Sequence, residues 1–264
     1  MSSFPLKVDD LTVQFGHRKV LNRVCFKAYP GEINVIIGQS GSGKSTLLRH
    51  ALGLHQASGG RISLFGHYLD EMGDDALRQT RMKIGVLFQN GALFSSMTVY
   101  ENIATVIREN TDLPEPVIAE MARMKLSMVG LSEAARKHPE HLSGGMRKRA
   151  ALARAIATDP EILFCDEPSA GLDPVVASEL DDLLIRLCEN LDMTMVVVTH
   201  DIESIKKIAD RVAMLDSGKI ITEGPLEEVL KNPDRRVQDF FNRVSHAAEK
   251  SQKMLFMMGE GEKG

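Results

Sequence analysis

The chain has 264 residues, of which 43% are hydrophobic and 26% are charged, a composition that is ordinary for a globular protein with a substantial core. Its formal net charge of −4 argues against a general nucleic-acid binder, because such proteins usually carry a basic surface. No long run of uncharged apolar residues occurs, so we predict that the chain does not span a membrane by itself.

The cysteines and the N-terminal residues indicate the cellular compartment of the protein. Cys25, Cys165 and Cys188 stand far apart without the spacing of a metal site, and an odd number of cysteines fits a reducing environment. The first residues lack the basic flank and apolar core of a secretory signal. These features predict a cytoplasmic protein.

The N-terminal part of the chain contains three runs that are typical of strands. Residues 6–15 alternate between apolar and polar side chains, residues 20–28 follow as a second strand, and the apolar run at 33–38 ends in a glycine-rich loop. The first two runs predict an antiparallel β layer near the N-terminus. A helix is predicted over residues 45–54.

Apolar runs alternate with helical patterns in the second half of the chain. Residues 161–167 and 193–200 are continuous apolar runs, which are typical of buried parallel strands. Helices are predicted over residues 144–157, 175–191 and 202–209. This alternation predicts an α/β fold with a parallel sheet.

Two segments differ from this pattern. Residues from about 90 to 159 are mostly helical and are interrupted by prolines, which predicts a helical subdomain inserted into the α/β core. Beyond Asn232 the apolar residues recur at helical spacing, which predicts a further helix that packs on the core or, alternatively, contacts another subunit. These residues are Val237, Phe240, Phe241, Val244 and Ala248.

Residues 38–45 match the phosphate-loop pattern G-x-x-x-x-G-K-[ST], between a predicted strand and a predicted helix. Backbone N–H groups of such a loop converge on phosphate oxygens, and the helix N-terminus adds a positive dipole end. Lys44 is expected to contact the β- and γ-phosphates, and Ser45 is expected to bind Mg²⁺. The phosphate-binding residues that we predict are Gly38, Ser40, Gly41, Gly43, Lys44, Ser45 and Thr46.

Polar residues end three other apolar runs. Asp166 and Glu167 end the apolar run at 161–167. Asp166 is expected to bind Mg²⁺, and Glu167 is expected to polarise a water aimed at the γ-phosphate. His200 ends the apolar run at 193–200, at the carboxyl end of a predicted strand, which is where ligands bind in open α/β sheets. Gln89 follows a third run and is expected to reach Mg²⁺ or the attacking water. The guanine-selecting motif N-K-x-D is absent, which disfavours a GTPase.

Leu142-Ser143-Gly144-Gly145 forms a second turn of phosphate-binding type before a helical run. A small-molecule P-loop kinase would not explain this turn. With it, the chain resembles the nucleotide-binding subunit of an ABC transporter over roughly residues 6–233. The matching motifs, in the order and spacing of that family, are residues 38–45, Gln89, 142–146, 166–167, 169–173 and His200.

The resemblance implies a P-loop NTPase with a RecA-like core of ABC type, an inserted helical subdomain and an N-terminal antiparallel β layer. Residues 1–233 would form the ATP-binding domain and residues 234–264 a C-terminal helical tail. Mg-ATP would be bound and hydrolysed, with Glu167 and His200 orienting the water. Phe15 would stack on adenine, unless it belongs to the core of its strand.

By the same resemblance, two copies of the chain meet head to tail. Ser143 and the N–H groups of Gly144 and Gly145 would then cap the ATP that is held by the phosphate loop of the other copy. Met146 replaces the glutamine that is common in the family, and because methionine lacks an amide, it cannot make the hydrogen bonds of that glutamine to the ribose of that ATP. Lys148 and Arg149 follow, either as a solvated basic face or with a role in the site.

Residues 88–103 correspond to the region where this family meets an integral membrane permease dimer. Its apolar residues are expected to be exposed there, or in part to belong to the subdomain core: Gly91, Ala92, Leu93, Phe94, Met97 and Val99. Combined with LSGGM, this region is similar to the ATPase subunits of Mce/Mla-type lipid transporters. That similarity implies phospholipid transport between membranes, a lipid-binding Mce-type component, and a peripheral location at the cytoplasmic face of the inner membrane.

Other functions fit the same motifs. A lipoprotein-release or small-solute transporter is the main alternative, because a nucleotide-binding subunit does not itself contact the substrate. Soluble ABC ATPases of translation or DNA repair usually join two cassettes or contain a long coiled coil, neither of which occurs here. An ABC-type ATPase that signals through a membrane partner would carry the same motifs.

Overall fold

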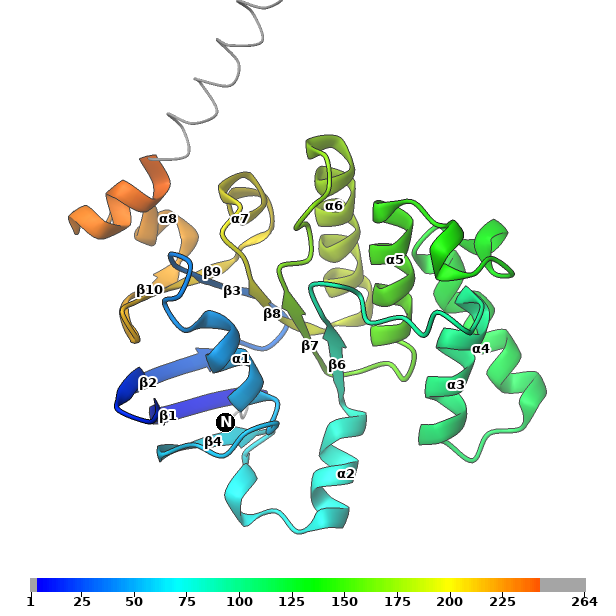
Figure 1. Cartoon of the computed structure of the whole chain (residues 1–264), viewed down its shortest axis with the longest axis horizontal. Helices are drawn as coiled ribbons and strands as arrows, with labels where there is room; N and C mark the ends of the chain where they lie inside the picture. The colour runs from blue at the N-terminus through cyan, green and yellow to red at the C-terminus, as the bar shows by residue number, and fades with distance from the viewer. Residues whose placement is uncertain (1–3, 243–264) are drawn as a thin grey trace, which may run out of the picture.

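Two β-sheets form the centre of the fold in a computed structural model that describes residues 4–242 (Figure 1). The larger sheet has six strands in the order β10-β9-β3-β8-β7-β6. The pairs from β6 to β9 are parallel, and β9 pairs antiparallel with β10. Its strands are β3 (Ile33–Ile37), β6 (Ile84–Leu87), β7 (Ile162–Asp166), β8 (Thr194–Val198), β9 (Arg211–Asp216) and β10 (Lys219–Pro225).

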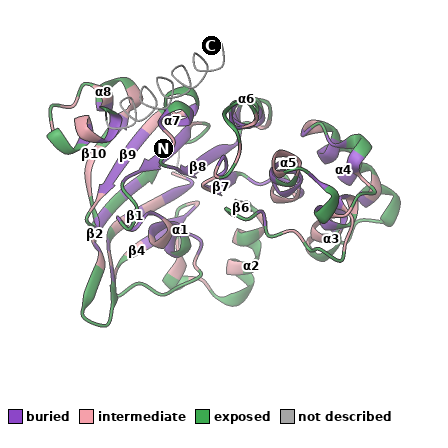
Figure 2. Cartoon of the chain, turned by 45° about the horizontal axis from the view of Figure 1, so that its top comes forward, coloured by how far each residue is buried: buried purple, intermediate pink, exposed green. Residues whose placement is uncertain are grey.

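The central strands of this sheet are buried on both faces. Every residue of β3 and β8 is buried, which explains why their sequences are continuous apolar runs. The predicted parallel sheet is thereby confirmed. Figure 2 shows these strands as buried, whereas the outer faces of the surrounding helices are exposed.

The smaller sheet has four antiparallel strands in the order β2-β1-β4-β5. This confirms the predicted antiparallel layer near the N-terminus. The hairpin of β4 and β5 was not predicted, because two glycines begin β4 and β5 has only two residues. The strands are β1 (Leu6–Phe15), β2 (Arg18–Ala28), β4 (Gly59–Leu64) and β5 (His67–Tyr68).

Strand β3 lies between two hydrophobic cores. Ile33, Val35 and Ile37 face the core that contains helices α3 to α6, whereas Ile36 faces the core beneath the four-stranded sheet. Leu47 of helix α1 (Lys44–Ala51) lies in that second core. The loop between β3 and α1 is therefore anchored by packed apolar residues at both of its ends.

Helices between β6 and β7 gather on one side of the molecule (Figure 1). A capping box of Thr98 and Glu101 begins α3, and Pro114 is the N-cap of α4. They lie within the predicted helical insertion, whose boundaries at 90 and 159 stay a prediction. They are α3 (Val99–Asn110), α4 (Glu115–Met128) and α5 (Gly144–Ala155), with 3₁₀ turns at Ser132–Ala134 and Pro139–His141.

The remaining helices surround the sheets. The predicted helices at 175–191 and 202–209 correspond to α6 and α7, and α1 is shorter than predicted because it ends at Ala51. Helices α2 and α8 and the β9–β10 hairpin were not predicted. The bounds are α2 (Asp74–Met82), α6 (Pro174–Leu191), α7 (Ile202–Ile208) and α8 (Leu226–Leu230), with a 3₁₀ turn at Leu69–Glu71.

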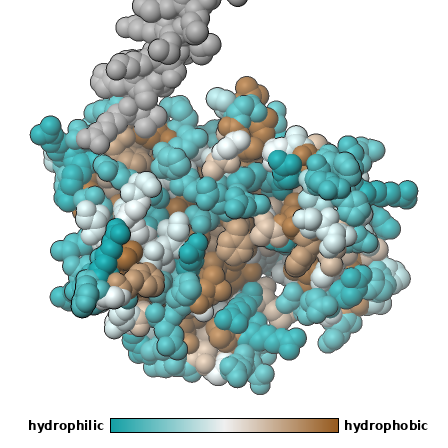
Figure 3. Space-filling view, viewed as in Figure 1, coloured by the Kyte–Doolittle hydropathy of each residue, from teal (hydrophilic) through white to brown (hydrophobic). Residues whose placement is uncertain are grey.

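Part of the predicted C-terminal helix lies within the described residues. Residues 235–242 are helical, and Val237, Phe240 and Phe241 are buried against the core. Val244 and Ala248 lie outside the described residues. Within residues 4–242, no helix is long and apolar enough to cross a bilayer. Figure 3 shows hydrophobic residues gathered along the middle of one face, between the β-rich part and helices α3–α5.

An ion pair between a buried lysine and a half-exposed aspartate connects the helical region to the sheet. Lys125 of α4 is 1% exposed and pairs with Asp159, which precedes β7. We predict that Asp159→Asn lowers the free energy of unfolding by about 1–3 kcal/mol, because the buried ammonium loses its carboxylate. Asparagine tolerates the left-handed backbone at this position, where φ is 52°.

Urea unfolding of Asp159→Asn measures this loss. The double variant Lys125→Met/Asp159→Asn is the control and should recover most of the stability, because an apolar side chain of similar length fills the site. An Asp159→Asn variant as stable as the wild type would show that the ion pair contributes nothing.

Candidate functional site

A cavity of about 830 Å³ opens beside the loop between β3 and α1. Its volume is within the range of small-molecule sites. Six separate segments line it, and they bring together most of the predicted site residues. These are Phe15, Gly38, Ser40, Gly41, Gly43, Lys44, Ser45, Thr46, Gln89, Glu167 and His200.

The phosphate loop has a backbone that only glycine adopts readily. Gly43 is the N-cap of α1 with φ of 111°, and a Cβ added there would lie 2.7 Å from Leu21 Cδ2. No side chain caps the helix, so its first N–H groups have no side-chain partner. Ser42 Oγ is buried without a hydrogen-bond partner. An anion at the loop would satisfy these donors.

Lys44 lies across this loop. Its Nζ donates to the carbonyl oxygens of Gly38 at 2.8 Å and Gln39 at 3.1 Å. Burial lowers the pKa of Lys44, while the charges of Glu167 and Asp166 act in the opposite direction. The ammonium is therefore held at the position where a polyphosphate would meet the loop.

Asp166 ends β7 close to Ser45. The Ser45 Oγ donates to Asp166 Oδ1 at 3.4 Å. Burial raises the pKa of Asp166, and the charge of Glu167 raises it further. A bound cation would offset both effects on the pKa. The Ser45 hydroxyl and the Asp166 carboxylate are oxygen ligands, which Mg²⁺ prefers. The residues at this position thus fit the metal that the sequence predicts.

Glu167 and His200 are in direct contact. His200 Nδ1 lies 2.8 Å from Glu167 Oε1, and the side chains are 69% and 13% exposed respectively. Glu167 has a left-handed backbone with φ of 49°, and its N–H donates to the carbonyl oxygen of Val198 at 2.8 Å. Such conformations in residues other than glycine cluster at functional sites. The pair can orient a water while remaining within reach of solvent.

Phe15 lies at the end of β1 and is 58% exposed. The interpretation of Phe15 as a strand core residue is therefore wrong. Three other residues line the cavity without any sequence pattern that places them there: Arg18, Val20 and Phe240. Phe240 belongs to the C-terminal helical segment, which only the three-dimensional fold brings to the cavity.

The second glycine turn does not line this cavity. Ser143 is the N-cap of α5, and its Oγ accepts from the N–H of Met146 at 3.2 Å. A Cβ added to Gly145 would lie 2.4 Å from Val176 Cγ1, so this glycine permits close packing on α6. Met146 is half-buried and packs against the core. Ser143, Gly144 and Gly145 thus present a helix N-terminus away from the phosphate loop of their own chain.

Lys148 and Arg149, which follow this turn, have different surroundings. Lys148 is 7% exposed, and its Nζ donates to the carbonyl oxygens of Gln89 at 2.6 Å and Glu167 at 3.1 Å. The interpretation of Lys148 as part of a solvated face is therefore wrong. Arg149 forms an ion pair with Glu179 at 2.7 Å.

The segment after Gln89 is partly exposed. Phe94 is 52% exposed, as predicted, and Phe88, which precedes Gln89, is 37% exposed. Val99 is buried in the core, and Leu93 packs against that core. Part of the predicted contact region is thus interior.

Known proteins match both the sequence and the fold. The model of the ABC transporter family matches residues 21–170. The chain is 40% identical over 240 residues to the intermembrane phospholipid transport system ATP-binding protein MlaF of Haemophilus influenzae, with 91% of each chain covered. It is 39% identical over 237 residues to the probable ribonucleotide transport ATP-binding protein mkl of Mycobacterium tuberculosis, covering 90% of this chain and 66% of that one.

A solved structure is also similar. The dimeric, post-hydrolysis ATP-binding cassette MJ0796 with bound ADP and Pi has a TM-score of 0.76 and 31% identity, over 84% of this chain and 98% of that one. Its fold matches the P-loop core and the antiparallel sheet described above. The chain therefore belongs to the ABC transporter family, as one of its ATP-binding and ATP-hydrolysing subunits.

Proposed function

We propose that this chain hydrolyses ATP to drive the movement of phospholipids between membranes through a partner permease. The observation that carries the ATPase part is the cavity in which Lys44, Glu167 and His200 meet around one phosphate loop. Asp166 lies beside this loop, where its carboxylate accepts from the hydroxyl of Ser45. The lipid part rests on the 40% identity to an intermembrane phospholipid transport ATP-binding protein.

ATP would bind with its phosphates on the loop of residues 38–46. The N–H groups at the start of α1 and the ammonium of Lys44 would hold the β- and γ-phosphates. The adenine would stack on the exposed ring of Phe15 at the other side of the cavity. This arrangement would place the γ-phosphate toward Glu167.

Magnesium would be held by the Ser45 hydroxyl, the Asp166 carboxylate and the Gln89 amide, together with phosphate oxygens. The ion neutralises charge that develops on the phosphates. Asp166 has to be ionised for this role, and the positive charge of the ion would favour that form despite burial.

Glu167 would act on the attacking water. Its carboxylate accepts a proton or a hydrogen bond from the water, whose oxygen then bonds to the γ-phosphorus as the bond to the β–γ bridging oxygen breaks. His200, at 2.8 Å from Glu167 Oε1, would hold that carboxylate in one orientation. Most of the rate enhancement would come from this positioning and from charge stabilisation.

A second copy of the chain would complete each site. Ser143, Gly144 and Gly145 are exposed or half-exposed, lie at a helix N-terminus and do not line their own cavity. They would contact the γ-phosphate bound to the other copy, in a head-to-tail dimer with two equivalent sites. The dimeric relative with bound ADP and Pi supports this arrangement.

The other partners would be membrane components. The exposed Phe94 and Phe88 beside Gln89 would meet an integral membrane permease dimer at the cytoplasmic face of the inner membrane. A lipid-binding Mce-type component would complete the transporter, and no nucleic acid would take part. The second candidate function is ribonucleotide transport, which is named for a relative of 39% identity.

Glu167→Gln separates ATP binding from hydrolysis. The amide keeps the shape of the carboxylate but is no base, so we predict a loss of turnover of at least about 100-fold with ATP affinity within about twofold of wild type. Phosphate release and fluorescent-nucleotide titration measure the two quantities. Lys44→Ala is the contrasting variant and should weaken nucleotide binding or hydrolysis. Full turnover by Glu167→Gln would refute its role.

Phe15 provides a test of adenine stacking. Because stacking of a base on an aromatic ring contributes about 1–3 kcal/mol, Phe15→Ala should weaken ATP binding by about 5- to 150-fold. Phe15→Tyr keeps the ring and is the matched control, with affinity expected within about twofold of wild type. Isothermal titration with ATP measures both. Equal affinities of the Ala and Tyr variants would exclude stacking.

The transported substrate is tested by a mild-detergent pull-down of the tagged chain from its native membranes, with mass spectrometry of proteins and lipids. We expect a polytopic permease, a lipid-binding component and enriched phospholipid. A permease with a different binding protein and no lipid would favour ribonucleotide or small-solute transport. Recovery of no membrane protein would contradict the transport function.

A further inference from the structure

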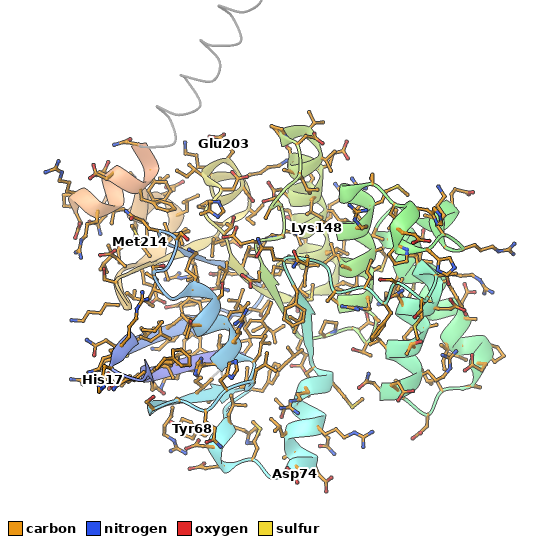
Figure 4. The ribbon with its side chains drawn as sticks, in the orientation of Figure 1. His17, Tyr68, Asp74, Lys148, Glu203 and Met214 are labelled. Carbon is orange, nitrogen blue, oxygen red and sulfur yellow. The ribbon has the colours of Figure 1, made fainter. Side chains whose placement is uncertain are left out.

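Helix α5 connects the second glycine turn to the interior of the nucleotide site. It begins directly after Ser143 and lies between the other helices of its region and the central sheet (Figure 1). Lys148 lies on the side of α5 that faces this sheet (Figure 4). At 7% exposure, its side chain is shielded from solvent although it carries a charge.

The ammonium of Lys148 joins two segments that are far apart in the sequence. Its Nζ donates to the carbonyl oxygen of Gln89, which follows β6, at 2.6 Å and to that of Glu167, which follows β7, at 3.1 Å. Both residues line the nucleotide cavity. An ammonium has donors only, and charge-assisted hydrogen bonds to carbonyl groups are stronger than neutral ones. This buried charge thus holds the backbones of two site residues together.

The backbone of Glu167 depends on such contacts. Its φ of 49° is a left-handed conformation that side chains other than glycine adopt at a cost. The N–H of Glu167 is held by Val198 at 2.8 Å, and its carbonyl oxygen is held by Lys148. Without Lys148, the carbonyl oxygen of Glu167 would lose this hydrogen bond, and the backbone that positions its carboxylate would be less constrained.

A second cation on α5, Arg154, contacts the segment that follows Gln89. Arg154 donates to the carbonyl oxygens of Ala92 at 2.6 Å and Gly91 at 3.1 Å. Lys148 and Arg154 therefore fix the chain after β6 at two points, on either side of residue 90. The position of α5 and the position of Gln89 cannot change independently while these contacts last.

We propose that Lys148 is a positioning residue for ATP hydrolysis, an inference that rests on the ATPase function proposed above. It aligns Glu167 with Gln89 through their backbone carbonyl groups and does not itself line the nucleotide cavity.

Lys148→Met tests this role, because methionine fills a similar volume without a donor. Small displacements at a catalytic site cost up to about 100-fold in rate, so we expect kcat to fall by about 10- to 100-fold. The ATP dissociation constant should stay within about twofold, because Phe15 and the phosphate loop are untouched. Steady-state hydrolysis, ATP titration and thermal unfolding are measured on the full chain.

Lys207→Met is the matched control. Lys207 on α7 also donates to a backbone carbonyl, that of Ser178 at 2.8 Å, and pairs with Asp182, but it does not line the nucleotide cavity. Its kcat should stay within about twofold of wild type. A Lys148→Met protein with wild-type kcat would overturn the proposal. So would a loss of ATP affinity in parallel with kcat, since that result indicates general damage to the fold.

Lys148→Arg provides a second test, and it replaces the first if Lys148→Met does not fold. Arginine keeps the charge and the donors, but its planar fork cannot place one nitrogen at both carbonyl groups. We expect a kcat between those of the wild type and Lys148→Met at unchanged ATP affinity. Full kcat or weakened ATP binding in Lys148→Arg would overturn the role. An inactive wild-type chain would instead contradict the ATPase function itself.

Discussion

The burial of β3, β7 and β8 within the parallel sheet is the constraint on which the rest of the structure depends. Strands that are packed on both faces have no freedom to shift, so the residues that follow them are held in fixed positions. The phosphate loop follows β3, Glu167 follows β7, and His200 follows β8 after one residue. The polar groups of the site thus owe their relative positions to apolar packing that contains no catalytic group.

The second glycine turn depends on a different element. Helix α5 keeps Ser143 away from the cavity of its own chain, while Lys148 on the same helix reaches the backbone of that cavity. One helix therefore has an end suited to the phosphate of a second copy and a side chain directed at its own site. Met146, which packs against the core, leaves the serine and glycine donors of this end in place.

The sequence predicted those parts whose local pattern is unambiguous. Continuous apolar runs predicted the buried strands. The spacing of the glycines, the lysine and the serine predicted the phosphate loop, because this pattern is typical of one kind of turn. The sequence could not predict the contacts of Lys148. Helical periodicity does not distinguish a lysine that faces solvent from one that donates to carbonyl groups of two distant segments. The sequence likewise left Val99 between a partner-facing surface and the subdomain core, and it lies in the core. Phe240 and the β9–β10 hairpin depend on long-range packing that no local pattern reveals.

Light scattering tests most directly whether ATP is held between two copies of the chain. The Glu167→Gln variant is measured with and without Mg-ATP, alone and combined with Ser143→Arg, which places a bulky side chain at the exposed turn. We expect Mg-ATP to double the mass of Glu167→Gln, and we expect the double variant to bind ATP as a monomer. Equal dimerisation of both variants, or binding of ATP by Glu167→Gln with no change in mass, would contradict the shared site.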